Sequence, residues 1–291
     1  MKTTLIHPAT FKLDGGAMFG IIPKPLWEKK IQPDELNRIN MSLRVVLFET
    51  ENKKILVDTG LGDYHHEKFK TQFDIKSDNT PLINSLRQLN LKAEDITDII
   101  LTHLHFDHVG GLGTGEKGTD VIFKNATVHV HEEHYKYSQE ATLRDSGSFH
   151  KQTFIPLLNW YEEKGKLNLL KDDDAIIIED GGETVSYKTS FGHTPFMIHP
   201  YTDDFIYMAD LVPMRHHLHI PWVMGYDIEP GTTTEYKKLF YDFIYAKNLT
   251  MIFEHDNDVW GGKLVFDEKN RPKLSNELKS NYHITQRIDL Y

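Results

Sequence analysis

Four side chains that can bind a metal ion stand within six residues of this 291-residue chain, in the segment His103-Leu104-His105-Phe106-Asp107-His108. The two histidines at positions i and i+2 can converge on one ion from a loop, and the aspartate and histidine that follow can face a second ion after a turn. Histidine and aspartate are common ligands of zinc, and histidine is also the usual general acid or base. A loop that is rich in histidine by chance is the alternative interpretation. The two apolar spacers and the further ligand-type residues elsewhere favour a metal site.

Three more ligand-type residues occupy the same context, the end of a predicted strand. His193 follows the strand at 184–190, Asp210 ends the strand at 205–210, and His255 follows the strand at 250–254. The end of a strand in a rigid sheet is a place from which a loop can hold functional residues accurately. The sequence therefore predicts one site that draws on distant parts of the chain.

The elements that must position these residues are strands and helices in alternation. Apolar, β-branched runs predict strands at 42–50, 54–58, 98–102 and 127–131, the first two as a hairpin. Apolar residues at helical spacing predict helices at 80–90, 131–143, 149–164 and 232–248. Thr80 is the expected N-cap of the first helix, and we expect a break near Pro156 in the third. We also expect a solvated strand face at His129 and His131, and a polar surface tail after Trp260.

No linker-like stretch divides the chain, so we expect residues 1–291 to form a single domain of two βα halves that share one core. Acidic residues outnumber basic ones by 43 to 33, and the net charge of -10 argues against a nucleic acid as the main partner. The chain has no cysteine, which excludes thiolate metal ligands and fits a cytoplasmic location. We expect no membrane partner, because no run approaches the ~20 apolar residues of a membrane span and the opening residues lack the apolar stretch of a secretion signal.

These motifs together resemble those of the metallo-β-lactamase superfamily over nearly the whole chain. The shared features, in the family's order, are an Asp58-Thr59-Gly60 turn, the ligand block at 103–108, a Gly-His-Thr-Pro segment at 192–195, Asp210 and His255. The resemblance implies an α/β fold, an αββα sandwich with a binuclear metal site at one edge. It also implies a first ion held by His103, His105 and His193, a second ion held by Asp107, His108 and His255, Asp210 as the bridge between them, and Asp58 as a residue that orients a ligand histidine.

This ligand set suits two Zn²⁺ ions per chain, with iron, manganese and cobalt as the alternative metals. Iron-containing relatives usually carry Glu where His105 stands, which favours zinc and hydrolysis over redox chemistry. Two ions about 3.5–4 Å apart can share a hydroxide that attacks a carbonyl group at neutral pH. Asp107 is expected to act in catalysis as well as to bind metal.

Within the superfamily, the chain is most similar to the N-acyl-homoserine lactone lactonases and to their organophosphate-degrading relatives. The segments at 14–20, 23–27, 210–213 and 221–227 carry this likeness. It implies a dinuclear zinc hydrolase that opens the lactone ring by attack of a metal-bridging hydroxide, with quorum quenching as its role. A β-lactamase proper is disfavoured, because many zinc enzymes of that group use a cysteine ligand.

One position departs from the lactonase pattern. Familiar lactonases place a substrate-binding tyrosine three residues after the bridging aspartate, where this chain has Pro213. Either the role is lost and the histidines at 216, 217 and 219 form an exposed loop, or one of them takes it over. His217 is the first choice, either as a hydrogen-bond donor or as a general acid. The residues expected to bind the substrate are Met18, Phe19, His217 and Trp222.

Two other functions stay open on the sequence alone. The same hydroxide can attack phosphorus or other carbonyl centres, so a related phosphotriesterase or arylesterase-type metallohydrolase is the second hypothesis. A non-catalytic, metal-containing protein that binds a ligand is the third, and the complete set of seven ligands argues against it. The expected partner is a small-molecule substrate, an acylated lactone, and a homodimer is compatible with the sequence.

Overall fold

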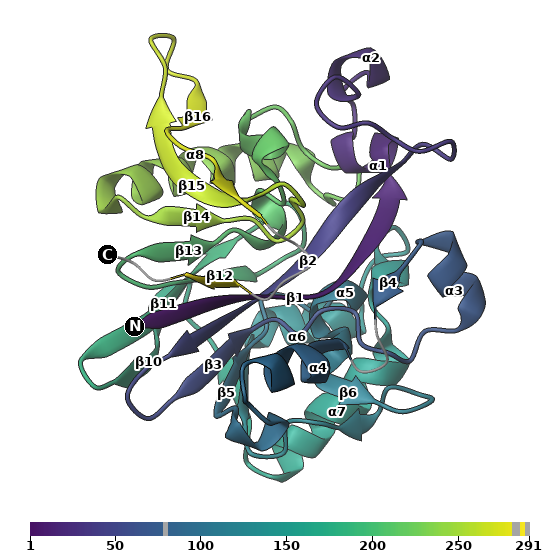
Figure 1. The fold of residues 1–291 in the computed structure, drawn as a ribbon, viewed down its shortest axis with the longest axis vertical. Helices are drawn as coiled ribbons and strands as arrows, with labels where there is room; N and C mark the ends of the chain where they lie inside the picture. Colours follow the sequence, from purple (N-terminus) through teal and green to yellow (C-terminus); the bar gives the residue numbers. More distant parts are fainter. Residues whose placement is uncertain (78–80, 281–285, 289–291) are drawn as a thin grey trace.

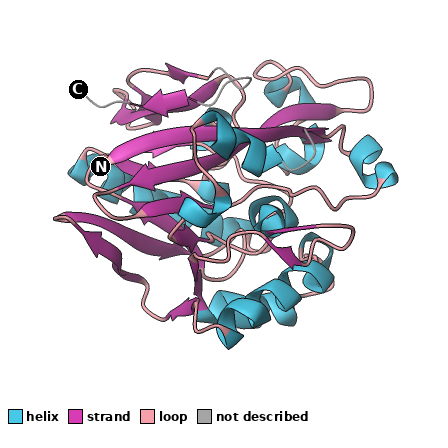
Figure 2. Ribbon diagram, turned by 60° about the horizontal axis from the view of Figure 1, so that its bottom comes forward, coloured by secondary structure: helices cyan, strands magenta, loops and turns pink. Residues whose placement is uncertain are grey.

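Two mixed sheets of eight strands each lie face to face, and helices cover their outer faces (Figure 1). The computed structural model describes residues 1–77, 81–280 and 286–288. Figure 2 shows the strands running through the middle of the molecule with helices around them. The αββα sandwich expected from the sequence is confirmed.

The first sheet has the strand order β18-β1-β2-β3-β5-β8-β9, with β4 paired to β1. Its strands are β1 (Lys2–Asp14), β2 (Arg38–Glu49), β3 (Lys54–Val57), β4 (Lys76–Ser77), β5 (Asp98–Ile100), β8 (Thr127–His131), β9 (Leu167–Leu170) and β18 (Gln286–Ile288). The second sheet has the order β10-β11-β12-β13-β14-β15-β16, with β17 paired to β15. Its strands are β10 (Asp174–Asp180), β11 (Glu183–Ser190), β12 (Met197–Tyr201), β13 (Phe205–Tyr207), β14 (Thr250–Ile252), β15 (Val259–Phe266), β16 (Pro272–Leu274) and β17 (Leu278–Lys279). The short strands β6 (Gly113–Thr114) and β7 (Asp120–Val121) pair separately.

Helices connect and cover these strands. The α-helices are α1 (Gly15–Phe19), α2 (Lys24–Trp27), α3 (Glu67–Gln72), α4 (Pro81–Gln88), α5 (Phe106–Val109), α6 (Glu132–Gln139), α7 (Lys151–Glu163) and α8 (Pro230–Lys247). Short 3₁₀ helices span Ala93–Asp95, Gly110–Leu112, Ser146–Ser148, Ala209–Leu211 and Arg215–Leu218. Among the described helices, none is long and apolar enough to cross a membrane.

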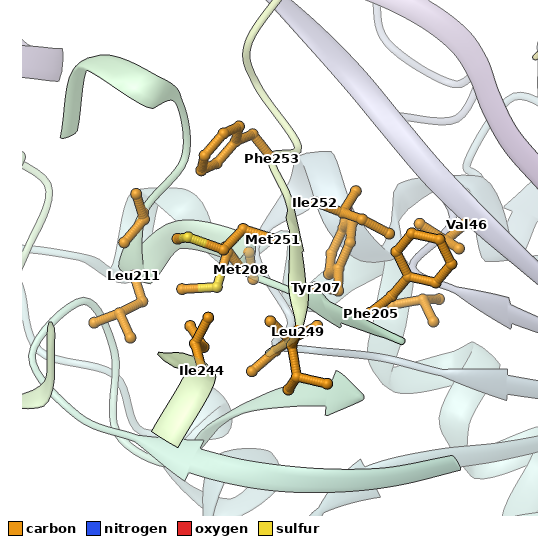
Figure 3. Close-up of a cluster of buried hydrophobic side chains, with 14 of the residues drawn as sticks. Val46, Phe205, Tyr207, Met208, Leu211, Ile244, Leu249, Met251, Ile252 and Phe253 are labelled. Atoms are coloured by element: carbon orange, nitrogen blue, oxygen red, sulfur yellow. The ribbon is translucent and has the colours of Figure 1, made fainter. Parts of the chain in front are cut away.

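The core between the sheets is apolar on both sides. Val46 of β2 faces residues of the second sheet such as Phe205 and Ile252, and Ile244 of α8 packs against the same cluster (Figure 3). A second apolar cluster joins the outer face of the first sheet to α4 and α7, which contribute Leu86 and Leu157 among others. Burial of these side chains, at roughly 25 cal/mol per Å² of apolar surface, drives the four layers together.

Three expectations about these elements are wrong. Pro156 lies inside a continuous helix α7, because the apolar face of that helix stays packed on the first sheet around the proline. The chain after Trp260 continues β15, which pairs with β14 within the second sheet. His129 and His131 are buried, because β8 is an interior strand between β5 and β9. The expected N-cap Thr80 lies outside the described residues.

Candidate metal centre

The seven predicted metal ligands lie together at one edge of the sandwich. β3 and β5 run parallel in the first sheet, and β13 and β14 run parallel in the second. Asp210 and His255 follow β13 and β14, whereas the ligand block begins three residues after β5. All seven ligand residues are at most 7% exposed, so a buried polar cluster forms where strands of both sheets end.

The segment that carries four of the ligands is held against the turn that follows β3. The Thr59 N–H donates to the His108 carbonyl at 2.8 Å, and the Gly111 N–H donates to the Gly60 carbonyl at 3.0 Å. A Cβ atom on Gly111 would lie 2.1 Å from the Thr59 carbonyl oxygen, so only glycine permits this approach. The glycine after the ligand block therefore serves to position the block.

A first group of ligand atoms comes from three histidines and one carboxylate. His105 Nδ1 lies 3.0 Å from His103 Nε2 and 3.2 Å from His193 Nε2. Asp210 Oδ2 lies 3.5 Å from His103 Nε2 and 3.1 Å from His193 Nε2. Four ligand atoms thus face one point, as the resemblance implied for the first ion.

A second group consists of Asp107, His108 and His255, and Asp210 joins it to the first. The Asp107 carboxylate lies 3.9 Å from His108 Nε2 and 3.8 Å from His255 Nε2. Asp210 presents Oδ2 to His108 at 3.3 Å and Oδ1 to His255 at 3.2 Å. Ala209, directly before it, has a φ of 39°, a left-handed conformation that is rare for alanine. This strained backbone places Asp210 between the two groups.

The donor atoms fit metal ions. Zinc bonds of ~2.0–2.1 Å in a tetrahedral site separate neighbouring ligand atoms by about 3.3 Å, close to the spacing in the first group. His108 Nε2 and Asp210 Oδ1 are buried, and although each has a polar neighbour within 3.3 Å, neither makes a well-aligned hydrogen bond to a described residue. Buried polar atoms without a partner are rare unless an ion or a water completes them.

Two carboxylates hold the outward-facing nitrogens of ligand histidines. Asp58 Oδ2 lies 2.9 Å from His108 Nδ1, and Asp227 Oδ1 lies 3.0 Å from His193 Nδ1. Asp58 has a φ of 59° and also accepts the Thr102 N–H at 2.7 Å, so its position is itself fixed. Such partners orient the ring and make its inner nitrogen a better ligand.

His255 is held in place by residues of β2. Its Nδ1 lies 2.9 Å from the Ser42 carbonyl, and the buried Arg44 donates to the Asp256 carbonyl at 2.8 Å. β2 therefore anchors the segment that supplies His255.

Glu254 lies in the same buried region, with its carboxylate 3.1 Å from His108 Nδ1. Burial raises the pKa of Glu254 to about 7, although His108 and His255 act in the opposite direction.

The nearby carboxylates also raise the pKa of two ligand histidines, His193 and His255. Burial alone would lower the pKa of His193, but Asp210 and Asp227 outweigh it and raise that pKa to about 10. Burial likewise opposes the rise at His255, where Glu254 and Asp210 bring the pKa to about 9. In the metal-free chain these histidines hold protons at neutral pH, so metal ions and protons compete for the same nitrogens.

A cavity of about 170 Å³ opens onto both ligand groups. His105, Asp107, His193, Asp210 and His255 form part of its lining. The other lining residues are Leu13, Met18, Met41, Phe73, Phe106, Gly147, Ser148, Met224 and Tyr226. The cavity therefore joins a metal-binding floor to a mostly apolar wall.

The predicted substrate residues fall into two sets. Met18 lines the cavity, whereas Phe19 is fully buried behind it, with its ring stacked on those of Trp27 and His217. His217 is also fully buried, and its Nε2 lies 2.8 Å from the Met18 carbonyl. Trp222 borders a different groove. Neither His217 nor Phe19 nor Trp222 is among the residues that line the cavity, and this geometry does not support the direct substrate contacts expected of them.

Three residues with clear positions at the site were missed. Asp227 and Tyr226 lie in a segment whose lactonase-like sequence gave a signal, but nothing in that signal pointed to these side chains. Glu254 directly precedes His255 at the end of an apolar strand, and a charged residue in that place was the available clue.

A sandwich of two mixed sheets with histidine and aspartate ligands at the strand ends defines a class of metal-dependent hydrolases. The family model described as "Metallo-beta-lactamase superfamily" matches residues 44–264, and the chain belongs to that superfamily.

The similar curated proteins include lactonases. The chain is 32% identical over 116 residues to the N-acyl homoserine lactonase of Bacillus cereus, which is 37% of this chain and 46% of that protein. It is 22% identical over 182 residues to the N-acyl homoserine lactonase AttM of Agrobacterium fabrum, 61% of this chain and 65% of that protein. The chain thus spans about half of the length of the first of these relatives and less than two thirds of the second.

Solved structures share the fold over almost the whole chain. A probable metal-dependent hydrolase from Staphylococcus aureus has a TM-score of 0.83 at 24% identity, and the alignment covers 96% of each chain. AidC, a dizinc quorum-quenching lactonase, has a TM-score of 0.72 at 19% identity, covering 96% of this chain and 95% of that one. At these identities the likeness establishes the fold.

Proposed function

We propose that this protein is a dinuclear zinc hydrolase that opens the lactone ring of N-acyl-homoserine lactones. The observation that carries the proposal is the junction of two ligand groups through Asp210 at the floor of a largely apolar cavity. The lactonases among its relatives support the same substrate class.

The cavity suits a small, uncharged ring with an apolar tail. Its volume of about 170 Å³ is close to that of a cavity of about 150 Å³ that accommodates benzene in another protein. Among the described residues that line it, none is lysine or arginine, which disfavours a strongly anionic substrate. A lactone ring on the floor would leave the acyl tail to extend along Met18 and Phe106 toward the mouth.

Two zinc ions, when bound, supply an activated water and a positive charge that polarises a carbonyl group. The two ligand groups of the chain hold these ions. Asp58 fixes the orientation of the His108 ring, and Asp227 fixes that of the His193 ring. Asp107 lines the cavity, where its carboxylate can accept the proton that the attacking water loses. The bond between the carbonyl carbon and the ring oxygen then breaks. The ring oxygen takes up the proton from Asp107, which completes the hydrolysis.

A substrate panel at one pH tests the proposal. Zinc-loaded protein is assayed with N-hexanoyl-homoserine lactone, an aryl ester, a phosphotriester and a β-lactam, and its zinc content is measured. We expect about two zinc ions per chain and the highest kcat/KM with the acylated lactone. A preference for the phosphotriester or the aryl ester would replace the lactonase with a related metallohydrolase. Bound zinc without any turnover would favour a ligand-binding protein.

A further inference from the structure

The wall of the cavity has few polar side chains apart from the candidate metal ligands. Among the described lining residues these are Ser148 and Tyr226. Tyr226 has the larger reach, and its hydroxyl makes no hydrogen bond with any described residue. Tyr226 as a residue is 36% exposed, whereas the ligand residues on the floor are at most 7% exposed. Tyr226 therefore lies toward the mouth of the cavity and carries an uncommitted hydrogen-bonding group.

The backbone on both sides of Tyr226 is firmly held. The Gly225 N–H donates to the Ala17 carbonyl at 2.8 Å. Arg144 Nη2 donates to the Gly225 carbonyl at 2.5 Å and to the Asp227 carbonyl at 3.1 Å. These bonds tie together three segments that all line the cavity, since Met18 follows Ala17 and Ser148 lies four residues after Arg144. Tyr226 is thus a fixed part of the wall.

The same segment is attached to the metal centre. Asp227 holds His193 Nδ1 with one carboxylate oxygen at 3.0 Å and accepts the Met224 N–H with the other at 3.2 Å. Any movement of Tyr226 relative to the ligands would therefore strain the partner of His193. The backbone position of Tyr226 is therefore set by the segment that orients a ligand histidine.

The Tyr226 hydroxyl is a neutral donor. Burial raises the pKa of Tyr226 to about 12, and the carboxylates of Asp14 and Asp107 add to the rise. The hydroxyl therefore keeps its proton at the pH of any ordinary assay. Asp107, one of the two carboxylates that raise this pKa, lines the same cavity as Tyr226.

We propose that the Tyr226 hydroxyl donates a hydrogen bond to the amide carbonyl of the acyl group and so selects N-acylated lactones over plain lactones. This inference rests on the proposed function, because it takes the ring carbonyl to lie on the metal-binding floor. The next polar group of an N-acyl-homoserine lactone is its amide, which then lies on the mouth side of the ring beside Tyr226. Apart from Ser148 and the candidate metal ligands, the other described residues that line the cavity have no side chain that could donate to the amide oxygen.

Tyr226→Phe tests this proposal with two substrates, N-hexanoyl-homoserine lactone and the amide-free γ-butyrolactone. One neutral hydrogen bond contributes about 0.5–1.5 kcal/mol, so we expect kcat/KM for the acylated lactone to fall about three- to tenfold. The loss should lie mainly in KM, because the amide gains no charge during the reaction. The amide-free lactone should react at the wild-type rate. Zinc content and Tm should be unchanged, which excludes a merely structural effect.

Tyr245→Phe is the matched control, because Tyr245 lies exposed on α8 away from the cavity. Equal losses with both substrates, or no loss with either, would overturn the proposal while leaving the lactonase function intact. A wild-type protein that hydrolyses neither lactone would overturn the proposed function, and the role of Tyr226 with it.

Discussion

The metal ligands and the wall of the cavity above them are built in different ways. The ligands follow strands of both sheets, and carboxylates or carbonyl groups hold outward nitrogens such as those of His108, His193 and His255. The wall combines Leu13 and Met41 of the long strands β1 and β2 with short loop and helical segments, two of which are joined by the hydrogen bond from Gly225 to Ala17. The loop segments of the wall can change substrate preference without loss of the metal centre.

This comparison makes a general prediction about variants. Changes among the ligands should lower metal content and rate together, whereas changes in the wall should alter rate or selectivity with metal retained. Asp227 belongs to both regions, since it orients His193 and anchors the segment of Met224 and Tyr226.

Asp210→Asn should have the largest effect. Asp210 lies within 3.5 Å of four ligand histidines, and the substitution removes its negative charge from both groups. Loss of a residue that only orients a ligand typically costs 10–100-fold, so we expect loss of this shared ligand to lower kcat/KM by more than about 100-fold. Elemental analysis should show reduced zinc content. The exposed Asp203→Asn serves as the control, and a fully active, fully metallated Asp210→Asn would mean that the ligand set is wrong.

Asp227→Asn should have the next largest effect. Asparagine keeps an oxygen for one hydrogen bond but loses the charge that raises the pKa of His193. We expect activity to fall about 10–100-fold, the usual range for a partner that orients a ligand, with zinc affinity also weakened. A competition titration with a chelator measures that affinity. If the rate fell while the affinity stayed at the wild-type value, Asp227 would act through the wall rather than through His193.

The sequence predicts the metal ligands better than it predicts the wall of the cavity. The block at 103–108 is visible because its four ligands are adjacent, and His193, Asp210 and His255 each follow an apolar strand. The alternation of strands and helices predicts two βα halves, and the resemblance to the metallo-β-lactamase superfamily implies the αββα layers.

Apart from Met18, the residues of the wall could not be predicted, because they look like ordinary core or loop residues. Met41 and Phe73 reach the cavity only through the pairing of β2 with β1 and the path of the loop after α3. The burial of His217 depends on α8, whose Lys237 binds the His217 carbonyl at 2.9 Å. Such contacts join positions that no local pattern links.

Met18→Ala and Phe19→Ala should distinguish a residue that lines the cavity from a residue that packs behind it. Met18 lines the cavity, and each methylene of an acyl tail buried there is worth about 0.8 kcal/mol. We expect kcat/KM to rise from short to medium acyl chains in the wild type and to rise less steeply in Met18→Ala. Phe19→Ala should keep the trend but lower the free energy of unfolding by about 3–5 kcal/mol, because it empties a packed site. A flattened trend in Phe19→Ala alone would instead put Phe19 in contact with the tail.

His217→Ala should have the smallest effect on the rate. A general acid or base contributes about 10²–10⁴-fold, but His217 is buried and bonded to the Met18 carbonyl, so we expect less than about a tenfold loss at unchanged zinc content. Burial, with a smaller contribution from Lys237, lowers the pKa of His217 to about 3.

Because this pKa is below the value of about 6.5 in the unfolded chain, the folded state binds fewer protons there. The neutral imidazole therefore stabilises the fold above about pH 6.5, and that contribution is lost as the pH falls toward 3. The difference in Tm between the wild type and His217→Ala should be largest near pH 7–8 and shrink on acidification. A pH-independent difference would contradict the lowered pKa of His217. A loss of rate above 100-fold with zinc retained would return His217 to the role of a catalytic residue.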